Sequence, residues 1–157
     1  MAPRTNARTQ SDALVFEARL ARARARLATL RAEPNTQWRL WEHAGYFVPY
    51  VRVGRERDTV RAERYRDSQA ALAWSAKAAW GNAAPLSSRE VEVFALIVRR
   101  SRRGDSDNLM KAILDAIKGI VYNDDRQVSF QACKVVRPPF QSVSGDYAEV
   151  WIGNPTK

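Results

Sequence analysis

The stretch 90–98 constrains the fold most, because it is apolar on both faces of an extended chain. Its alternating residues form two apolar sets: Phe94, Leu96 and Val98 on one face, and Val91, Val93, Ala95 and Ile97 on the other. A strand that is apolar on both faces is covered on both sides and lies inside a sheet. The run therefore predicts a central strand, and such a strand is a rigid mount for a functional group.

Directly after this strand, the chain places basic and acidic residues close together. Four arginines come first, and two aspartates one residue apart follow: Arg99, Arg100, Arg102, Arg103, Asp105 and Asp107. In extended chain, side chains two residues apart point the same way, so both carboxylates can face one cation. Arginines attract phosphate, whereas carboxylates repel it unless a cation lies between them. The combination predicts a site that binds a nucleic-acid backbone through a divalent metal.

A helix is expected over 107–118, because apolar residues recur there at steps of three and four. Ser106 or Asp107 can cap its start, and Gly119 suits the left-handed position after its end. Lys111 lies one turn beyond Asp107, so its ammonium can reach the space in front of the paired carboxylates.

A second acidic pair, Asp124 and Asp125, falls in a turn before another apolar strand. Magnesium takes oxygen ligands and usually keeps some waters, so two or three carboxylates suffice to hold it. The alternative is that Asp107 only caps a helix and the 123–125 segment only forms a turn. The ordered combination with the arginines and Lys111 favours the metal site.

Three short segments in this region resemble the signature of the RusA family of Holliday junction resolvases: DSDNLMK at 105–111, LDA at 114–116 and NDDRQV at 123–128. The resemblance implies a homodimeric, Mg²⁺-dependent endonuclease that cuts four-way DNA junctions, with Mn²⁺ as a substitute metal. By position, the metal-binding acids would be Asp105, Asp107 and Asp125, and the active-site lysine would be Lys111. Asp124 matches an acidic position of less certain role.

Basic residues around these acids are the expected DNA contacts: Arg99, Arg100, Arg102, Arg103, Lys118 and Arg126, with Arg57 and Arg61 earlier in the chain. Gly104 occupies a position where the family commonly has a basic residue. The resemblance implies a role in DNA recombination, repair or phage DNA processing, in the cytosol of a bacterium or a phage-infected host.

Composition supports an acidic partner. The formal net charge is +9 over 157 residues, and it comes mainly from arginine, which grips phosphate with paired donors. A basic surface without a partner is the alternative. One cysteine and one histidine exclude an internal disulfide, a zinc set and a histidine-based triad. No apolar run approaches membrane-spanning length, and we expect a cytoplasmic protein.

The N-terminal part predicts a basic helix over 11–32, with a narrow apolar seam flanked by arginines. We expect the seam to pack on the body of its own domain. Pairing with a second subunit, loose attachment and DNA contact by the arginine face are the alternatives. Trp38 and Trp41, three residues apart, suit one helical face and core packing. The 46–53 stretch resembles a strand, and Pro49 indicates an edge or a bulge there.

The remaining pattern predicts a helix over 59–80 and strands over 127–136 and 146–152. The fold class is therefore α+β: a mixed sheet with helices packed mainly on one face, RusA-like, plus an N-terminal helical extension. We expect an extension over 1–36, a nuclease domain over 37–153 and a tail over 154–157.

Three functions agree with the residues. The first is the junction resolvase, and the second is a metal-dependent nuclease that acts on other branched DNA. The third is a non-catalytic basic nucleic-acid-binding protein whose aspartates only cap and turn. They differ in their substrate and in whether Asp107 is needed for cleavage.

Overall fold

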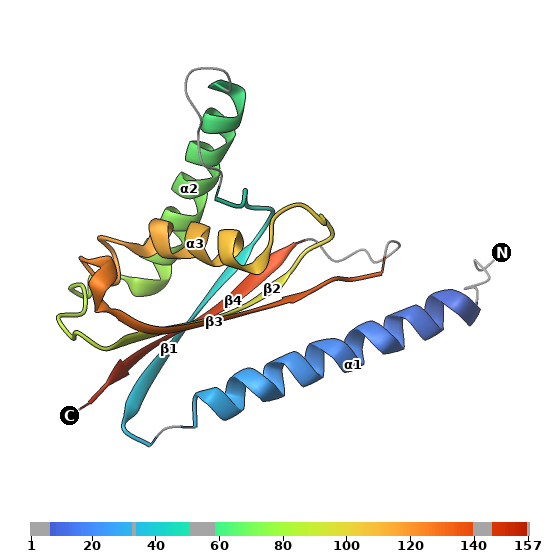
Figure 1. The fold of residues 1–157 in the computed structure, drawn as a ribbon, viewed down its shortest axis with the longest axis horizontal. Helices are drawn as coiled ribbons and strands as arrows, with labels where there is room; N and C mark the ends of the chain where they lie inside the picture. Colours follow the sequence, from blue (N-terminus) through green and yellow to red (C-terminus); the bar gives the residue numbers. More distant parts are fainter. Residues whose placement is uncertain (1–6, 33, 51–58, 140–145, 157) are drawn as a thin grey trace.

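A computed structural model describes residues 7–32, 34–50, 59–139 and 146–156. It shows a four-stranded sheet with helices on both faces (Figure 1). In chain order the elements are α1 (Ala7–Leu30), β1 (Thr36–Ala44), α2 (Thr59–Trp80), β2 (Val91–Val98), α3 (Ser106–Ile117), a 3₁₀ turn η1 (Asp125–Gln127), β3 (Val128–Val136) and β4 (Tyr147–Pro155). The predicted α+β class with a mixed sheet is confirmed.

The strand order is β1-β4-β2-β3. β2 pairs in parallel with β3 and antiparallel with β4, which also pairs antiparallel with β1. All residues of β2 are buried except Glu92, which is intermediate. The prediction of a central strand that is covered on both faces is therefore confirmed, and the open edges of the sheet are β1 and β3.

Each face of the sheet has its own apolar core. α2 and α3 pack over one face, against Val91, Val93, Ala95 and Ile97 of β2. α1 covers the opposite face, where Phe94, Leu96 and Val98 point. In Figure 1, α2 and α3 lie above the sheet and α1 runs below it. The two faces of one short strand thus hold both helical layers in place.

The expectation that the N-terminal helix packs on its own domain is confirmed. Phe16, Leu20, Ala23 and Leu27 of α1 are buried in the second core. On its polar side, Nε of Arg24 donates to Oε1 of Glu149 at 3.0 Å, and Glu149 on β4 is itself buried. The division into an extension, a nuclease domain and a tail stays a prediction.

The predicted helical setting of Trp38 and Trp41 is wrong, because both lie on β1. Residues three apart in a strand point to opposite faces, so each tryptophan enters a different core. Trp38 stacks on Phe94 with ring centroids 5.0 Å apart. Trp41 is buried on the other face and donates from Nε1 to Oγ of Ser75 at 2.9 Å.

The strand predicted over 46–53 is not formed over 46–50, and 51–58 lie outside the described residues. The backbone of this segment bonds to the helical layer instead of to a neighbouring strand. The amide of Val48 donates to Oγ of Ser68 at 2.7 Å, and the amide of Tyr50 donates to the carbonyl of Asn108 at 2.9 Å. The segment is thereby held beside the start of α3.

Helix α2 has the predicted bounds, and the residue that follows its end is Gly81, whose φ is +68°. β4 continues to Pro155, three residues beyond the predicted end. Over the part of the chain that the structure describes, no helix is both long enough and apolar enough to cross a bilayer.

The ion pair of Arg24 with Glu149 gives a direct test of the α1 packing. Changing Arg24 to Gln leaves the buried Glu149 carboxylate without its main donor. We expect the free energy of unfolding to fall by about 1–2 kcal/mol, because solvent screens the half-exposed arginine and limits the effect. Urea denaturation measures it. Arg22→Gln is the matched control on the same helix and should change stability by less than about 0.5 kcal/mol. Equal effects of the two substitutions would contradict the packing of α1 on β4.

Candidate functional site

Helix α3 begins at Ser106, and Asp105 is its N-cap. The Asp105 carboxylate accepts from the amide of Asn108 at 2.9 Å, so the expected cap at Ser106 or Asp107 is wrong. Asp107 lies in the first helical turn and not in extended chain, which changes the expected geometry of the acidic pair. Placing an acid in the first turn is favourable, because the positive end of the helix dipole lies there.

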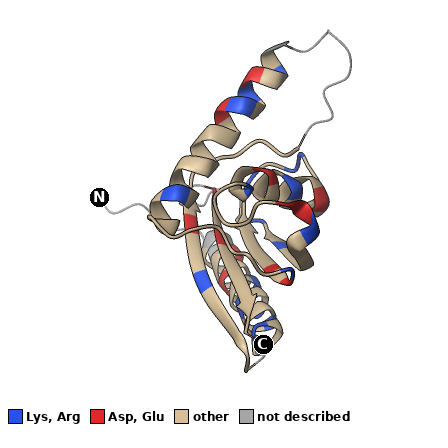
Figure 2. Cartoon of the chain, turned by 90° about the vertical axis from the view of Figure 1, so that its left-hand side faces the viewer, with Lys and Arg blue, Asp and Glu red and all other residues tan. Residues whose placement is uncertain are grey.

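A cavity of about 460 Å³ opens along the outer side of α3, next to the edge strand β3. We call it the acidic cavity, and its lining residues are Asp107, Lys111, Leu114, Asp115, Tyr122, Asp125, Val128, Ser129, Phe130 and Gln131. The structure therefore brings Asp107 and Lys111 of α3 and Asp125 of η1 to one cavity, whereas Asp105 and Asp124 are not among its lining residues. Figure 2 shows acidic and basic residues close together on α3 and the turn that follows it.

Charged residues of alternating sign lie in this cavity and, with Lys118, beside it. Lys111 Nζ lies 3.2 Å from Oδ1 of Asp115, one helical turn later. Lys118 Nζ donates to Oδ2 of Asp125 at 2.9 Å, and this hydrogen bond is the main cause that raises the pKa of Lys118. The two ammonium groups therefore lie beside carboxylates and partly offset their charge when no other cation is present.

Asp115 belongs to this set, although it was assigned from sequence only to the LDA segment, with no site role. Tyr65 on α2 donates from its hydroxyl to Asp115 Oδ2 at 3.2 Å. Burial and the Asp115 charge raise the pKa of Tyr65, so the phenol stays protonated and keeps this bond. Spacings of four residues from Lys111 and eight from Asp107 place Asp115 on the same helical face, and that spacing is the signal that could have identified it.

Asp107 and Asp125 lie toward opposite ends of the acidic cavity. Asp107 is in the first turn of α3 and Asp125 follows its end, and a helix of 12 residues spans about 18 Å. At one end, burial and then the Asp107 carboxylate raise the pKa of Cys133 on β3 to about 12. At the other end, burial first, then Asp125 and Asp115, raise the pKa of Tyr122.

The turn that carries Asp125 is fixed by hydrogen bonds. Asp124 caps η1 and accepts from the amide of Arg126 at 2.9 Å, and that bond is the largest cause of the lowered pKa of Asp124. Gln127 Oε1 accepts from the amide of Asp124 at 2.9 Å, which completes a capping box. The Gln127 amide group donates to the carbonyls of Leu86 and Ser88 at 2.8 and 2.7 Å.

The acidic residues of the cavity offer carboxylate oxygens, which are the ligands that a hard cation such as Mg²⁺ prefers. Within the described ranges, no three Asp, Glu, His or Cys side chains stand close enough together to form a ready-made metal cluster. Mg²⁺ is commonly held by one or two carboxylates together with substrate phosphates and waters. The acids present therefore fit a metal that binds together with a phosphate.

A second cavity of about 680 Å³ lies beside the start of α3. We call it the basic cavity, and its lining residues are Tyr46, Val48, Pro49, Tyr50, Arg61, Arg64, Arg103, Gly104 and Asn108. Two predicted DNA contacts, Arg61 and Arg103, meet here although they lie far apart in the chain. Guanidinium groups and tyrosine rings together suit a phosphodiester strand with its bases.

Arg99 does not occupy the expected DNA-contacting position. Its side chain is 1% exposed, and its guanidinium nitrogens have no hydrogen-bond partner in the described structure. Its Cζ lies 5.1 Å from the ring centroid of Tyr46. A buried guanidinium under a tyrosine ring cannot reach a DNA backbone, so this prediction is wrong.

The other predicted basic residues differ in their surroundings. Arg100, Arg102 and Arg103 are exposed, Arg126 pairs with Asp124, and Arg57 lies outside the described residues. The exposed arginines precede Asp105 in the loop that leads into α3. This loop thus has the basic character expected for the approach to the acids.

A family model described as Endodeoxyribonuclease RusA matches residues 48–145, which is well over half of the chain. The match contains α2, β2, α3 and β3 and therefore both cavities except for Tyr46. Among curated proteins, none matches the chain significantly.

Gly104 fixes the loop between the arginines and the acids, and it can be tested. Its φ is +83°, and a Cβ there would lie 2.5 Å from Cγ of Pro49. Gly104→Ala should lower the free energy of unfolding by about 2 kcal/mol or more through strain and this clash. Gly119 has a φ of +80°, and a Cβ at that residue would have nothing within 4 Å, so Gly119→Ala is the matched control that adds strain alone. Denaturant titration of both variants should show the larger loss for Gly104→Ala, and equal losses would contradict a contact with Pro49.

The burial of Arg99 also has a measurable consequence for stability and DNA affinity. Arg99→Met replaces a buried charge, which has no hydrogen-bond partner among the described residues, with an apolar chain, so stability should be kept or rise by up to about 2 kcal/mol. Affinity for a four-way DNA junction, measured by fluorescence anisotropy, should stay within about twofold of the parent, because the side chain is inaccessible. Arg103→Met is the comparison and should weaken binding. A loss of affinity at Arg99 as large as that at Arg103 would show that Arg99 reaches the DNA.

Proposed function

The chain belongs to the RusA family of endodeoxyribonucleases, and on that premise we propose that it resolves four-way DNA junctions by Mg²⁺-dependent, paired nicks. As a member of this family it is a hydrolase of DNA phosphodiester bonds that acts at branched junctions. The metal requirement, the pairing of the nicks and the homodimer are parts of the proposal.

The observation that carries the proposal is the acidic cavity. It collects Asp107, Lys111 and Asp125 of the family-matched segments along one side of α3. Isolated caps and turns would not need to share a cavity with Lys111. Carboxylates that alternate with lysines suit a site that binds a metal and a phosphate together. The carboxylates bind the metal, and the metal and the lysines neutralise the phosphate.

In this proposal one or two Mg²⁺ ions are held by Asp105, Asp107 and Asp125 together with phosphate oxygens, and Asp115 and Asp124 are supporting acids. Mn²⁺ is a substitute, because it also prefers oxygen ligands. The bound metal would polarise a phosphoryl oxygen and lower the pKa of the attacking water.

The side chains of the protein have separate tasks. Lys111 offsets the charge that develops on the phosphate, since its ammonium lies in the same cavity as the acids. Tyr65 keeps Asp115 in position beside Lys111 through its hydroxyl. Lys118 neutralises Asp125 until a phosphate and metal arrive.

The backbone of the DNA is held by the basic residues near the start of α3. Arg61, Arg64 and Arg103 line the basic cavity, and Arg100 and Arg102 lie exposed in the same loop. Contacts of this kind bind phosphate without reading the sequence, and the affinity they supply falls with salt.

Resolution of a four-way junction requires nicks in two opposed strands, which one active site does not easily deliver. A two-fold homodimer supplies two sites related by symmetry. We place this activity in recombination, repair or phage DNA processing in a bacterial cytosol. A nuclease for other branched DNA is the competing assignment, and a panel of flaps, three-way and four-way junctions separates the two.

The central test compares the parent protein with Asp107→Asn on a synthetic four-way junction with Mg²⁺, Mn²⁺ or EDTA. Cleavage by the parent should require the metal, and Asp107→Asn should lower the rate on the order of 10³-fold, because a ligand worth several kcal/mol in the transition state is removed. Junction affinity should be kept or rise, since a repelling charge is gone. Asp67→Asn, an exposed acid on α2, is the control and should cut like the parent.

Two outcomes would contradict the proposal. One is a parent protein that binds junctions and never cuts them with either metal. The other is an Asp107→Asn variant that cuts at the parent rate. Paired nicking is read separately with a supercoiled plasmid that extrudes a cruciform, where two coordinated nicks give a linear product and a single nick gives an open circle.

A further inference from the structure

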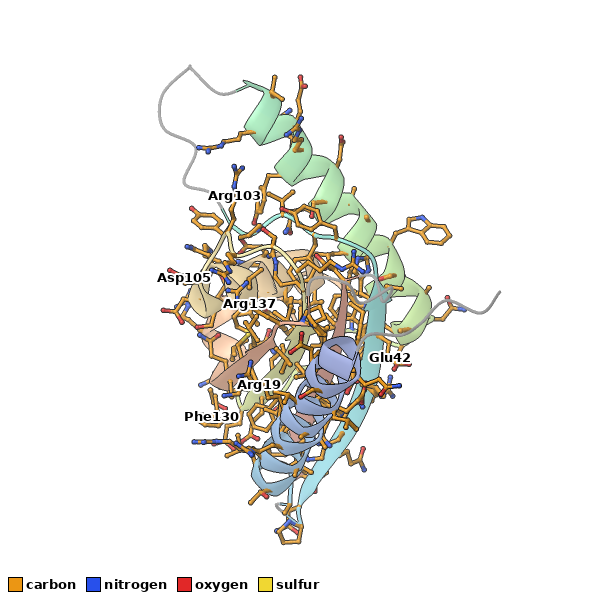
Figure 3. All side chains as sticks on the ribbon, turned by 90° about the vertical axis from the view of Figure 1, so that its right-hand side faces the viewer. Arg19, Glu42, Arg103, Asp105, Phe130 and Arg137 are labelled. Carbon is orange, nitrogen blue, oxygen red and sulfur yellow. The ribbon has the colours of Figure 1, made fainter. Side chains whose placement is uncertain are left out.

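A strongly basic groove lies between α1 and the edge strand β3, and it shares no lining residue with either cavity of the proposed nuclease site. Its volume is about 400 Å³, and we call it the α1–β3 groove. Its lining residues are Arg19, Arg22, Ala23, Arg26, Lys134, Val135, Val136 and Arg137. Five of these eight residues are cationic and none is acidic. In Figure 3, Arg19 and Arg137 lie on the same side of the molecule as Asp105, and Glu42 lies on the other side.

The cations of the groove have few partners of their own. In the described part of the chain, Arg19, Arg22, Arg26 and Lys134 form no hydrogen bond or ion pair with another side chain. Arg137 donates from Nη1 to the carbonyl of Ser101, a neutral group. Among the residues that the structure describes, no acidic side chain therefore pairs with the positive charge of the groove.

Other arginines of α1 show that this is not a general property of the helix. Arg24 pairs with Glu149, and Arg31, just after the end of α1, lies over the ring of Trp151 with Cζ 3.9 Å from the centroid. These two residues have partners on β4 and so help to dock the helix. The groove arginines contribute nothing of this kind to the packing of α1.

The arrangement of the groove arginines works against the helix itself. Arg19 and Arg22 are three residues apart, and Arg22 and Arg26 are four apart, so they are neighbours on one helical face. Like charges at these spacings destabilise a helix. Lys134 and Arg137 add two more positive charges from the opposite wall. A polyanion in the groove would turn this repulsion into attraction.

The groove also lies next to the acidic cavity along β3. Residues 128–131 of β3 line the cavity, and residues 134–137 line the groove. Gln131 and Lys134 are three positions apart, and a strand rises about 3.3 Å per residue, so the two sites are about 10 Å apart along the strand. The cavity lies on the α3 side of the sheet and the groove on its α1 side, and both lie at the open β3 edge.

We propose that the α1–β3 groove binds the sugar-phosphate backbone of one double-helical arm of the DNA whose cleavage takes place at the acidic cavity. The inference rests on the proposed function for the identity of the DNA as a branched substrate. A duplex arm fits better than a single strand, because no aromatic side chain lines the groove and single-strand sites use aromatic rings to stack bases. α1 precedes the family-matched residues 48–145, so this contact adds to what the matched domain offers.

The test measures binding in EDTA, so that cleavage plays no part. The groove variant Arg19→Gln/Arg22→Gln/Arg26→Gln is compared with a control that loses the same charge outside every lining set, Arg66→Gln/Lys77→Gln/Arg89→Gln. Affinity for a linear duplex, a four-way junction and a single strand is recorded across a salt series by fluorescence anisotropy.

We expect the groove variant to reduce the slope of log K against log salt by about 2–3 for the duplex and the junction, since each lost phosphate contact removes about one unit. Affinity for both should fall at least about tenfold near 0.1 M salt. The control should change the slope by less than about one unit, and the single strand should be affected less than the duplex. Thermal melting should show that the groove variant is folded, because the substitutions remove repulsion.

If the groove variant does not fold, Lys134→Gln/Arg137→Gln tests the same groove from the opposite wall, with an expected slope change of about 1–2. Equal binding by the groove variant and the control would overturn the inference, whether or not the parent cuts junctions. A larger effect on single strands than on duplex would also overturn it. If the groove variant loses affinity for duplex DNA but the parent protein never cuts DNA, the groove inference is supported and only the proposed nuclease function is refuted.

Discussion

Burial of β2 between two helical layers is the constraint on which the rest of the structure depends. Every second residue of this strand enters the α2/α3 core, and the others enter the α1 core. The strand leads directly into the basic loop and α3, and α3 packs back over the same strand. The position of the acids is therefore set by apolar packing, and exposed carboxylates can be brought together without support from hydrogen bonds among themselves.

Much of this architecture was predictable because its signals are dense and local. The bounds of α2, the central place of β2 and the amphipathic α3 follow from apolar periodicity. The tryptophans of β1 were misassigned, because a spacing of three fits one helical face as well as two opposite faces of a strand covered on both sides. Only the presence of a second core, built by α1, distinguishes the two cases.

The candidate site was predictable in its residue types and less so in its geometry. Asp107, Asp125 and Lys111 share a cavity as their order in the chain suggests, but the helix starts one residue early and takes Asp105 as its cap. Arg99 continues the alternation of β2 by one step, and that parity directs it to the buried α2/α3 face. Composition alone treated it as one more surface cation. A count of arginines cannot separate those that bind, those that dock a helix and those that lie inside.

The hydrogen bonds of Gln127 have a mechanical consequence. They attach the turn of Asp125 to Leu86 and Ser88, which come just before β2, while Asp105 and Asp107 come just after it. The two acid-bearing segments are thus attached to the two ends of one strand, and the length of β2 sets the distance between them. Insertions in surface loops would leave the separation of the two acid-bearing segments unchanged, whereas the insertion of two residues into β2 would increase it.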